Sequence, residues 1–213
     1  MTRRLYSVEP PDARAYQEGF DRTYTRIAGV YDTAVKFLPI WKTWLKRALP
    51  HIRGRRVLEV SFGTGYLMTH YAGQFDVYGI ELNARMLSVA KKNLRRVGLS
   101  ANLRQGKVED LPYDDGFFDT VVNTMAFSGY PDGTKAMTEL RRVLAPSGRL
   151  VLIDINYPVD RNWVGAKLTR CWQLAGDIIR DMDKILVAHG FDYEDIEIGG
   201  FGSVHMYICR HGI

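Results

Sequence analysis

The sequence predicts an α/β fold built on a mostly parallel sheet with helices on both faces. Short apolar runs alternate with longer amphipathic stretches from residue 55 to residue 157, which is typical of βαβ units. Two more strand-like runs near the C-terminus flank a cluster of glycines, and this arrangement predicts a terminal antiparallel pair. A glycine-containing turn follows the first apolar run, at the edge where open α/β sheets bind ligands.

Length and composition limit the function classes. The chain has 213 residues with a net charge of +5, which suits one globular domain with a small addition. Its two cysteines, Cys171 and Cys209, predict neither a disulfide framework nor a metal site. No apolar run approaches the roughly 20 residues of a membrane-spanning helix, and the N-terminus lacks the apolar core of a secretory signal. We therefore expect a cytoplasmic protein without a bound metal.

The expected elements follow in order along the chain. Residues 1–54 are predicted to be helical and to form a lid or substrate-binding extension, and residues 55–213 to form the main domain. Strands are expected at 56–60, 75–81, 101–106, 117–124, 149–157, 193–198 and 204–209, seven in all. Helices are expected after Gly65 and at 84–97, 134–144 and 163–189.

The most informative segment runs from Val57 to Leu67. Gly63 and Gly65 in the predicted turn let the main chain approach a ligand where a side chain would collide with it. A dinucleotide site would need a further glycine three residues after Gly65, but Met68 stands there, which disfavours a nicotinamide-dependent oxidoreductase. Glu59 lies inside the strand, and a buried carboxylate needs a polar or cationic partner.

This segment resembles the first motif of the class I S-adenosylmethionine-dependent methyltransferases, an acid followed by three alternate glycines. Glu59, Gly63 and Gly65 match the pattern, and Ser61 stands in the place of the first glycine. The resemblance implies a Rossmann-like class I methyltransferase fold, S-adenosyl-L-methionine as cofactor and methyl transfer as the activity. It also implies that these four residues contact the cofactor.

Glu81 ends the second predicted strand, 22 residues after Glu59. An acid near this offset accepts charge-assisted hydrogen bonds from the ribose hydroxyls, and the family has an acid here for that purpose. Leu82 and Met86 follow it and are expected to line the cofactor site. The alternative for Glu81 is a solvated residue at a strand end.

The segment from Gln105 to Val122 resembles the family's stretch between the third and fourth strands. Lys107 stands where the family often has an acid facing the adenine amine. We therefore expect the backbone around Val108 and Glu109 to contact the adenine edge. Asn123, at the carboxyl end of the fourth predicted strand, is expected to face the site.

The N-terminal part, with Tyr31 followed by Trp41 and Trp44, resembles the entry region of the quinone and phospholipid methylases. In that branch a tyrosine lies over the methionine end of the cofactor, and Tyr24 and Tyr31 are the candidates. A tyrosine ring near the sulfonium offers cation–π attraction. The alternative is ordinary helix packing of two aromatic residues.

Methyl transfer requires no protein nucleophile. The protein holds the acceptor and the methyl group roughly 3 to 3.5 Å apart and in line, and it excludes water. Some acceptors also need a base, for which Asp154, His205, Tyr130 and Tyr157 are candidates, and Tyr31 is a further catalytic candidate. Asp154 equally suits capping of a backbone turn, and a lone histidine such as His205 is more often a packed or surface residue.

Residues 36–56 carry seven basic residues and no acid, with two tryptophans among them. A basic amphipathic helix of this kind can lie on an anionic membrane, and the acceptor would then be a lipid head group or a quinone. The alternative is a core-packing helix with a solvated basic face.

The expected partner is a small-molecule or lipid-like acceptor. No nucleic-acid partner is expected, because an RNA-binding module and the Asn/Asp-Pro-Pro-aromatic signature of amino-base methylases are both absent from the sequence. A catalytically silent methyltransferase-like binding module is the alternative from another class, and Ser61 and Lys107 are the features that favour it.

Overall fold

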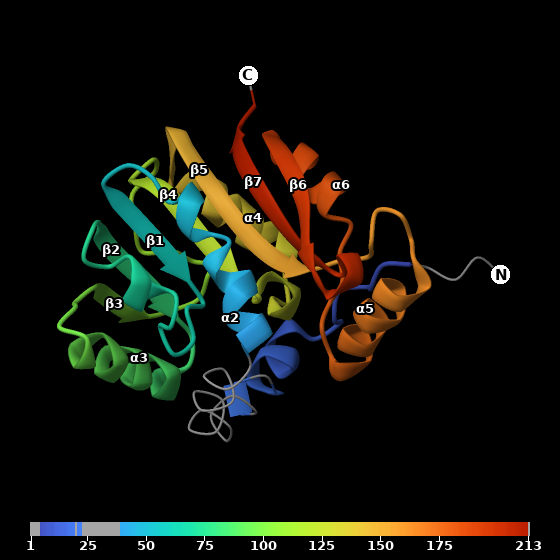
Figure 1. Cartoon of the computed structure of the whole chain (residues 1–213), viewed down its shortest axis with the longest axis horizontal. Helices are drawn as coiled ribbons and strands as arrows, with labels where there is room; N and C mark the ends of the chain where they lie inside the picture. The colour runs from blue at the N-terminus through green and yellow to red at the C-terminus, as the bar shows by residue number, and fades with distance from the viewer. Residues whose placement is uncertain (1–4, 20, 23–38, 213) are drawn as a thin grey trace.

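A computed structural model describes residues 5–19, 21–22 and 39–212. Its sheet has seven strands in the order β3-β2-β1-β4-β5-β7-β6 (Figure 1). The strands are β1 (Arg56–Val60), β2 (Asp76–Glu81), β3 (Asn102–Gln105), β4 (Phe118–Thr124), β5 (Leu144–Ile155), β6 (Phe191–Gly199) and β7 (Val204–His211). The α-helices with given bounds are α2 (Pro39–Lys46), α3 (Ala84–Arg96), α4 (Gly133–Arg142), α5 (Trp163–Ala175) and α6 (Met182–Ala188). Residues 13–19 and 21–22 are also helical.

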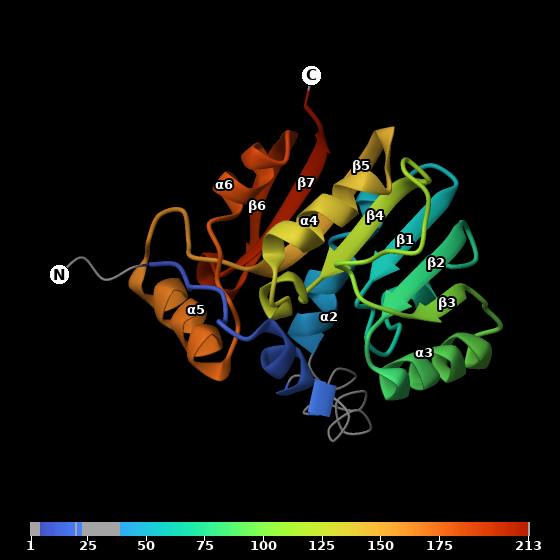
Figure 2. The ribbon, with the colours of Figure 1, turned by 180° about the vertical axis from the view of Figure 1, so that it is seen from behind.

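The sheet is parallel from β3 to β5, and β7 runs antiparallel to both of its neighbours. Helices α4 and α6 cover one face, and α2 lies against the other (Figure 2). The predicted fold class, a mostly parallel seven-stranded sheet with antiparallel terminal pairing and helices on both faces, is confirmed. Parallel strands covered on both faces explain why their sequences read as continuous apolar runs.

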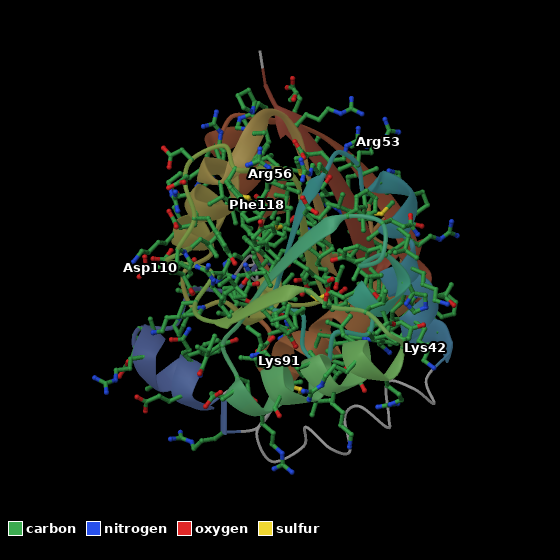
Figure 3. The ribbon with its side chains drawn as sticks, turned by 90° about the vertical axis from the view of Figure 1, so that its left-hand side faces the viewer. Lys42, Arg53, Arg56, Lys91, Asp110 and Phe118 are labelled. Carbon is green, nitrogen blue, oxygen red and sulfur yellow. The ribbon has the colours of Figure 1, made fainter. Side chains whose placement is uncertain are left out.

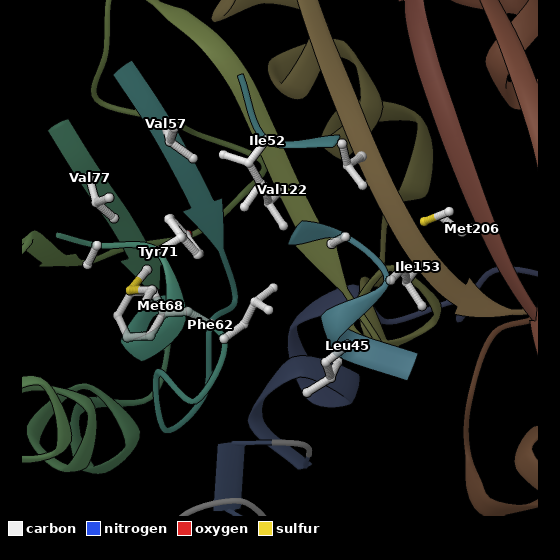
Figure 4. Packing of buried hydrophobic residues seen from close by; sticks show 14 of the residues in the cluster. Leu45, Ile52, Val57, Phe62, Met68, Tyr71, Val77, Val122, Ile153 and Met206 are labelled. Atoms are coloured by element: carbon white, nitrogen blue, oxygen red, sulfur yellow. The ribbon is translucent and has the colours of Figure 1, made fainter. Parts of the chain in front are cut away.

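The core consists of two apolar clusters, one on each face of the sheet. Along β5, Leu150 and Leu152 belong to one cluster, whereas Val151 and Ile153 belong to the other. This alternation follows from the two-residue period of a strand. Figure 4 shows the cluster on the α2 face, where Leu45 and Ile52 approach the sheet. Residues of α2 and of the stretch after it therefore contribute to the core.

Polar side chains cap the described α-helices α3, α4, α5 and α6. Asn83 accepts a hydrogen bond from the backbone N–H of Met86 at 2.9 Å and thereby begins α3. Residues of the same kind begin α4, α5 and α6, namely Asp132, Asn162 and Asp181. Each cap satisfies a backbone donor that lacks a partner within its helix, which fixes where the helix starts.

Two helix predictions are wrong in extent. The single helix expected at 163–189 is divided into α5 and α6, because Gly176 ends α5 in a left-handed conformation with φ of 116°. The helix expected after Gly65 is only a set of turns and a short 3₁₀ helix, Met68–His70. Its backbone mixes i−3 hydrogen bonds, as from Tyr71 to Met68, with i−4 bonds, as from Ala72 to Met68, so no regular α-helix forms.

The described N-terminal residues lie against the C-terminal half of the chain. The backbone N–H of Ser7 donates to the carbonyl of Ile179 at 2.8 Å, and the Tyr16 hydroxyl donates to the carbonyl of Gly176 at 2.7 Å. The division into a lid of residues 1–54 and a domain of residues 55–213 stays a prediction. Among the described helices, none has the length and apolar character needed to cross a bilayer.

Candidate functional site

A pocket opens at the carboxyl ends of β1, β2, β3 and β4. Its lining includes Glu59, Ser61 and Gly63 from β1 and the turn after it, Glu81, Leu82 and Met86 from the end of β2 and the residues after it, Val108 and Glu109 after β3, and Thr124 to Ala126 from the end of β4 onward. Gln17, Asp21, Trp41 and Leu45 line it from the N-terminal part. This is the edge where neighbouring parallel strands deliver their following loops to one place.

The turn after β1 has the conformation that a glycine motif requires. Ser61, Gly63 and Gly65 all have positive φ, at 51°, 55° and 70°. A Cβ built on Gly63 would meet no atom within 4 Å, so the missing side chain leaves open space at the pocket. A Cβ on Gly65 would come within 3.0 Å of the Ala90 Cβ. Gly63 therefore keeps the ligand side of the turn open, and Gly65 lets the turn pack against α3.

Glu59 has the polar partner that its burial requires. The Tyr71 hydroxyl donates to its Oε2 at 2.6 Å, and only 1% of the residue is exposed. Burial raises the pKa of Glu59 to about 8, although the Tyr71 hydrogen bond opposes this shift. A carboxyl group with such a pKa can bind a cationic ligand group as an anion or donate a hydrogen bond when protonated.

Glu81 links the turn to the second strand end. Its two carboxylate oxygens accept hydrogen bonds from the backbone N–H groups of Gly63 and Asn83, each at 2.9 Å. Burial raises the pKa of Glu81, and these backbone hydrogen bonds oppose the rise. The carboxylate is thus oriented at the pocket, where its other lone pairs can accept from a vicinal diol.

On the β3 side, Lys107, Val108 and Glu109 all line the pocket. Glu109 Oε1 is buried and has no hydrogen-bond partner among the described residues. An unpaired buried acceptor is costly, and burial raises the pKa of this carboxyl. A ligand amine at this end of the pocket would supply the missing donor.

Two predicted cofactor residues, Gly65 and Asn123, are not among the lining residues. Asn123 is fully buried, and its amide donates to the Tyr130 hydroxyl at 2.5 Å, which in turn donates to Ser61 Oγ at 2.8 Å. Asn123 thus acts through Tyr130, which does line the pocket. Tyr24 and Tyr31 lie outside the described residues.

The predicted bases Asp154 and His205 do not line the pocket. Asp154 is buried and accepts hydrogen bonds from the backbone and hydroxyl of Ser128 at 2.9 and 2.8 Å, as the turn-capping alternative implied. His205 is buried in β7 beside Asp195, with 2.7 Å between Nδ1 and Oδ1. Their proposed catalytic roles stay predictions that this geometry does not favour.

Sequence reasoning missed the pocket residues Gln17, Asp21 and Asp177. Asp21 accepts a hydrogen bond from the Asn83 side chain at 2.8 Å, which joins the N-terminal part to the start of α3. Asp177 follows the helix-ending Gly176, and that glycine within a predicted helix was the available signal. In the described part of the chain, no group of three or more His, Cys, Asp or Glu residues could hold a metal ion.

Comparison with known proteins supports the resemblance to methyltransferases. The profile of a family described as "Methyltransferase domain" matches residues 58–152. The chain is 31% identical over 127 residues to a ubiquinone/menaquinone biosynthesis C-methyltransferase of Idiomarina loihiensis, covering 57% of this chain and 51% of that protein. It is 32% identical over 162 residues to a demethylmenaquinone methyltransferase of Deinococcus radiodurans, covering 71% of this chain and 67% of that protein.

A phosphatidylethanolamine N-methyltransferase of Cereibacter sphaeroides is 32% identical over 141 residues, with 64% of this chain and 68% of that protein covered. The chain spans about half the length of several curated relatives that it matches, the Idiomarina protein among them. A solved S-adenosylmethionine-dependent methyltransferase of Clostridium acetobutylicum has the same fold, with a TM-score of 0.69 at 14% identity, covering 90% of this chain and 100% of that one.

Proposed function

The chain belongs to the class I S-adenosylmethionine-dependent methyltransferases, and on this premise we propose that it transfers a methyl group to a small or lipid-like acceptor. The main observation behind this proposal is that the backbone N–H of Gly63 donates a 2.9 Å hydrogen bond to the Glu81 carboxylate at the pocket. An open glycine turn and an oriented acid at adjacent strand ends fit an adenosyl group. The nicotinamide alternative lacks its third glycine, since buried Met68 occupies that position.

The pocket residues suit the parts of S-adenosylmethionine. Glu81 would accept hydrogen bonds from the ribose hydroxyls, and the main chain at Gly63 would lie against the ligand. The unpaired Oε1 of Glu109 would accept a hydrogen bond from the adenine amine. It would take the role of the family's acid, whose position Lys107 occupies in this chain. Glu59 would face the amino-acid end. When bound, the cofactor supplies a methyl group activated by its sulfonium.

The protein's part in catalysis is positioning and exclusion of water. Tyr130 and Ser61 form one wall through their hydrogen bond, and residues of the N-terminal part, including Gln17 and Trp41, form another. Holding the acceptor in line with the methyl group contributes by proximity, and a closed wall keeps water from competing. The chain's own groups thus set the geometry of the displacement.

We further propose that the acceptor is reached at an anionic membrane. The docking surface comprises the exposed apolar residues Ile40, Trp163, Leu168, Trp172 and Leu174, with the basic residues Lys42, Lys46, Lys167 and Arg170 on the same helices, α2 and α5. The ring centroids of Trp41 and Trp172 lie 6.1 Å apart, so α2 and α5 approach each other at these two side chains. Exposed aromatic and basic side chains together suit an anionic bilayer at the cytoplasmic side.

The activity is tested by incubating the protein with S-adenosylmethionine and either a reduced naphthoquinone or phosphatidylethanolamine vesicles. We expect calorimetry to detect binding of the cofactor and mass spectrometry to detect a methylated product. Binding without turnover of either acceptor would favour the silent-module alternative. Absence of any binding would contradict the whole assignment.

The membrane contact is tested by vesicle sedimentation. We expect binding to phosphatidylglycerol vesicles that weakens with salt and is reduced in a Trp163→Ala, Lys167→Ala double variant. Lys91→Ala provides a control, because Lys91 lies on α3, away from α2 (Figure 3). Equal affinity for neutral and anionic vesicles, or no binding at low salt, would exclude this surface as a membrane site.

A further inference from the structure

Two acids and a serine lie together beside the pocket. The Ser128 hydroxyl lies 2.8 Å from Asp154 Oδ1 and 2.8 Å from Asp177 Oδ1. Asp154 and Ser128 are buried, whereas Asp177 is only partly buried and lines the pocket. A ligand in the pocket can therefore contact Asp177, whereas Ser128 and Asp154 are buried next to it.

The cluster has a defined place for one added proton. A hydroxyl has a single hydrogen, so Ser128 can donate to only one of the two carboxylates. Asp154 already accepts from the backbone N–H groups of Ser128 and Ile155, at 2.9 and 2.7 Å, which stabilises its ionised form. The arrangement is complete when Ser128 donates to Asp154 and a protonated Asp177 donates to Ser128. Asp177 is thus the site that gains a proton.

The backbone holds Asp177 firmly in this place. Its own N–H donates to the Trp172 carbonyl at 3.1 Å, and the next residue, Ile178, donates to the Ser128 carbonyl at 2.7 Å. Gly176, directly before it, ends α5 and turns the chain toward the loop after β4. The carboxyl therefore sits on the β4 side of the pocket, opposite the adenine-side residues after β3.

The charged and titratable groups around Asp177 come from three elements. Asp154 of β5 and Tyr16 interact electrostatically with Asp177, and Arg180 interacts in turn with Asp154 and Tyr16. Burial and the Asp154 charge raise the pKa of Asp177 to about 6, with the Ser128 hydrogen bond opposing. A carboxyl with this pKa is ionised at neutral pH and still accepts a proton more readily than an exposed acid.

We propose that Asp177 is the base on the acceptor side of the pocket and that the acceptor is a hydroxyl or amine whose nucleophilic atom carries a hydrogen. Ser128 and Asp154 are positioning residues that complete the hydrogen-bond chain once Asp177 is protonated. The inference rests on the proposed methyl transfer. It adds a residue that neither the motifs nor the relatives' names supply.

The step balances without a further reagent. The lone pair of the acceptor oxygen or nitrogen forms the bond to the methyl carbon. The bond from this carbon to the sulfonium sulfur breaks, and its electron pair stays on sulfur. The hydrogen of the acceptor atom passes as a proton to Asp177, whose hydroxyl then donates to Ser128.

The test compares Asp177→Asn with wild type, using reduced naphthoquinone and phosphatidylethanolamine vesicles as the acceptors. We expect kcat/KM to fall by about 100-fold or more, as for loss of a general base. We expect the affinity for S-adenosylhomocysteine, measured by calorimetry, to remain within about twofold of wild type, since a base for the acceptor does not hold the cofactor. With the reduced naphthoquinone, the wild-type profile of kcat/KM should rise through about pH 6 and then level, and this rise should be absent from the variant.

Two further variants sharpen the test. Asp114→Asn is the matched control, because Asp114 is exposed and does not line the pocket, and its kinetics should equal those of wild type. Ser128→Ala should shift the midpoint of the acid limb, whereas a purely structural serine would lower the rate equally at every pH. Carboxyl ¹³C spectra of the protein labelled at aspartate should contain one resonance that titrates near pH 6 and is lost in Asp177→Asn.

The outcomes separate the two proposals. Unchanged kcat/KM in Asp177→Asn would overturn the base assignment while methyl transfer stands. A loss of S-adenosylhomocysteine affinity as large as the loss of rate would overturn it by assigning Asp177 to the cofactor. If wild type binds the cofactor but methylates neither acceptor, the proposed function fails, and this inference fails with it.

Discussion

Glu81 offers the most direct test at the scale of single residues. We predict that Glu81→Ala weakens binding of S-adenosylmethionine by about 1.5 to 3 kcal/mol, because charge-assisted hydrogen bonds to the ribose are lost. Glu81→Gln should lose less, since an amide oxygen can still accept from Gly63 or Asn83. Asp76→Asn, at the exposed start of the same strand, is the control for calorimetry. Unchanged affinity in a folded Glu81→Ala protein would refute the ribose assignment.

Glu59 gives a prediction about pH. Its carboxyl has a folded pKa of about 8, well above its ordinary value of 4.5, so the folded state keeps a proton that the unfolded state loses. This contribution to stability is complete below about pH 4.5 and is lost as pH rises toward 8, with a slope of at most about 1.4 kcal/mol per pH unit. Glu59→Gln should therefore lose less stability than wild type between pH 5 and pH 8. Parallel urea-denaturation curves across this range would contradict the prediction.

Ser61 shows what a motif comparison leaves open at a single position. Its place suggested a glycine, and the structure gives it the positive φ of 51° that a glycine would adopt. Its hydroxyl accepts a hydrogen bond from Tyr130 at 2.8 Å, and this bond offsets the energetic cost of the left-handed backbone conformation. The sequence shows that a serine occupies this position. It does not show that Tyr130, which is distant in sequence, hydrogen-bonds to that serine and stabilises its backbone conformation.

At the scale of elements, the turn after β1 contains two glycines with different roles. Gly63→Ala should cost about 1 kcal/mol of stability for its left-handed backbone and lower cofactor affinity about tenfold or more, because its Cβ points into open space at the pocket. Gly65→Ala should cost more stability, by about a further 1 to 3 kcal/mol, since its Cβ would approach Ala90 at 3.0 Å. Denaturation and calorimetry on both variants check this, and a reversed order would show that the roles are misassigned.

The strands were predictable from sequence, but the ends of the helices were less so. Strands such as β1 and β4 are buried on both faces, so their apolar runs are unmistakable. The region after Trp163 kept helical composition throughout, and its division depends on one left-handed glycine, Gly176. Asp177 was not predicted as a pocket residue for the same reason. Its position depends on the helix break at Gly176 and on its contact with Ser128, 49 residues away in sequence.

At the scale of the whole molecule, Arg180 ties three distant segments together. It is buried, donates to the carbonyls of Phe127 and Tyr130, and pairs with Glu9 at 3.3 Å. We predict that Arg180→Met lowers the free energy of unfolding by about 2 to 4 kcal/mol, because buried carbonyls lose their donors. Glu9→Gln should cost under about 1 kcal/mol, since Glu9 is about half exposed. Equal losses in urea denaturation would show that the ion pair, and not the carbonyl contacts, stabilises this junction.

The position of β7 has a consequence for how the protein is made. β7 follows β6 in sequence but lies between β5 and β6, and in the described sheet β6 pairs with β7 alone. During translation, β6 therefore leaves the ribosome before its neighbour exists, and β5 keeps an open edge for as long. The facing edges of β5 and β6 become paired only when β7, which begins at Val204, inserts between them. A nascent chain stalled before that point would expose two unpaired strands to other chains, so chaperone demand should peak before β7 is made.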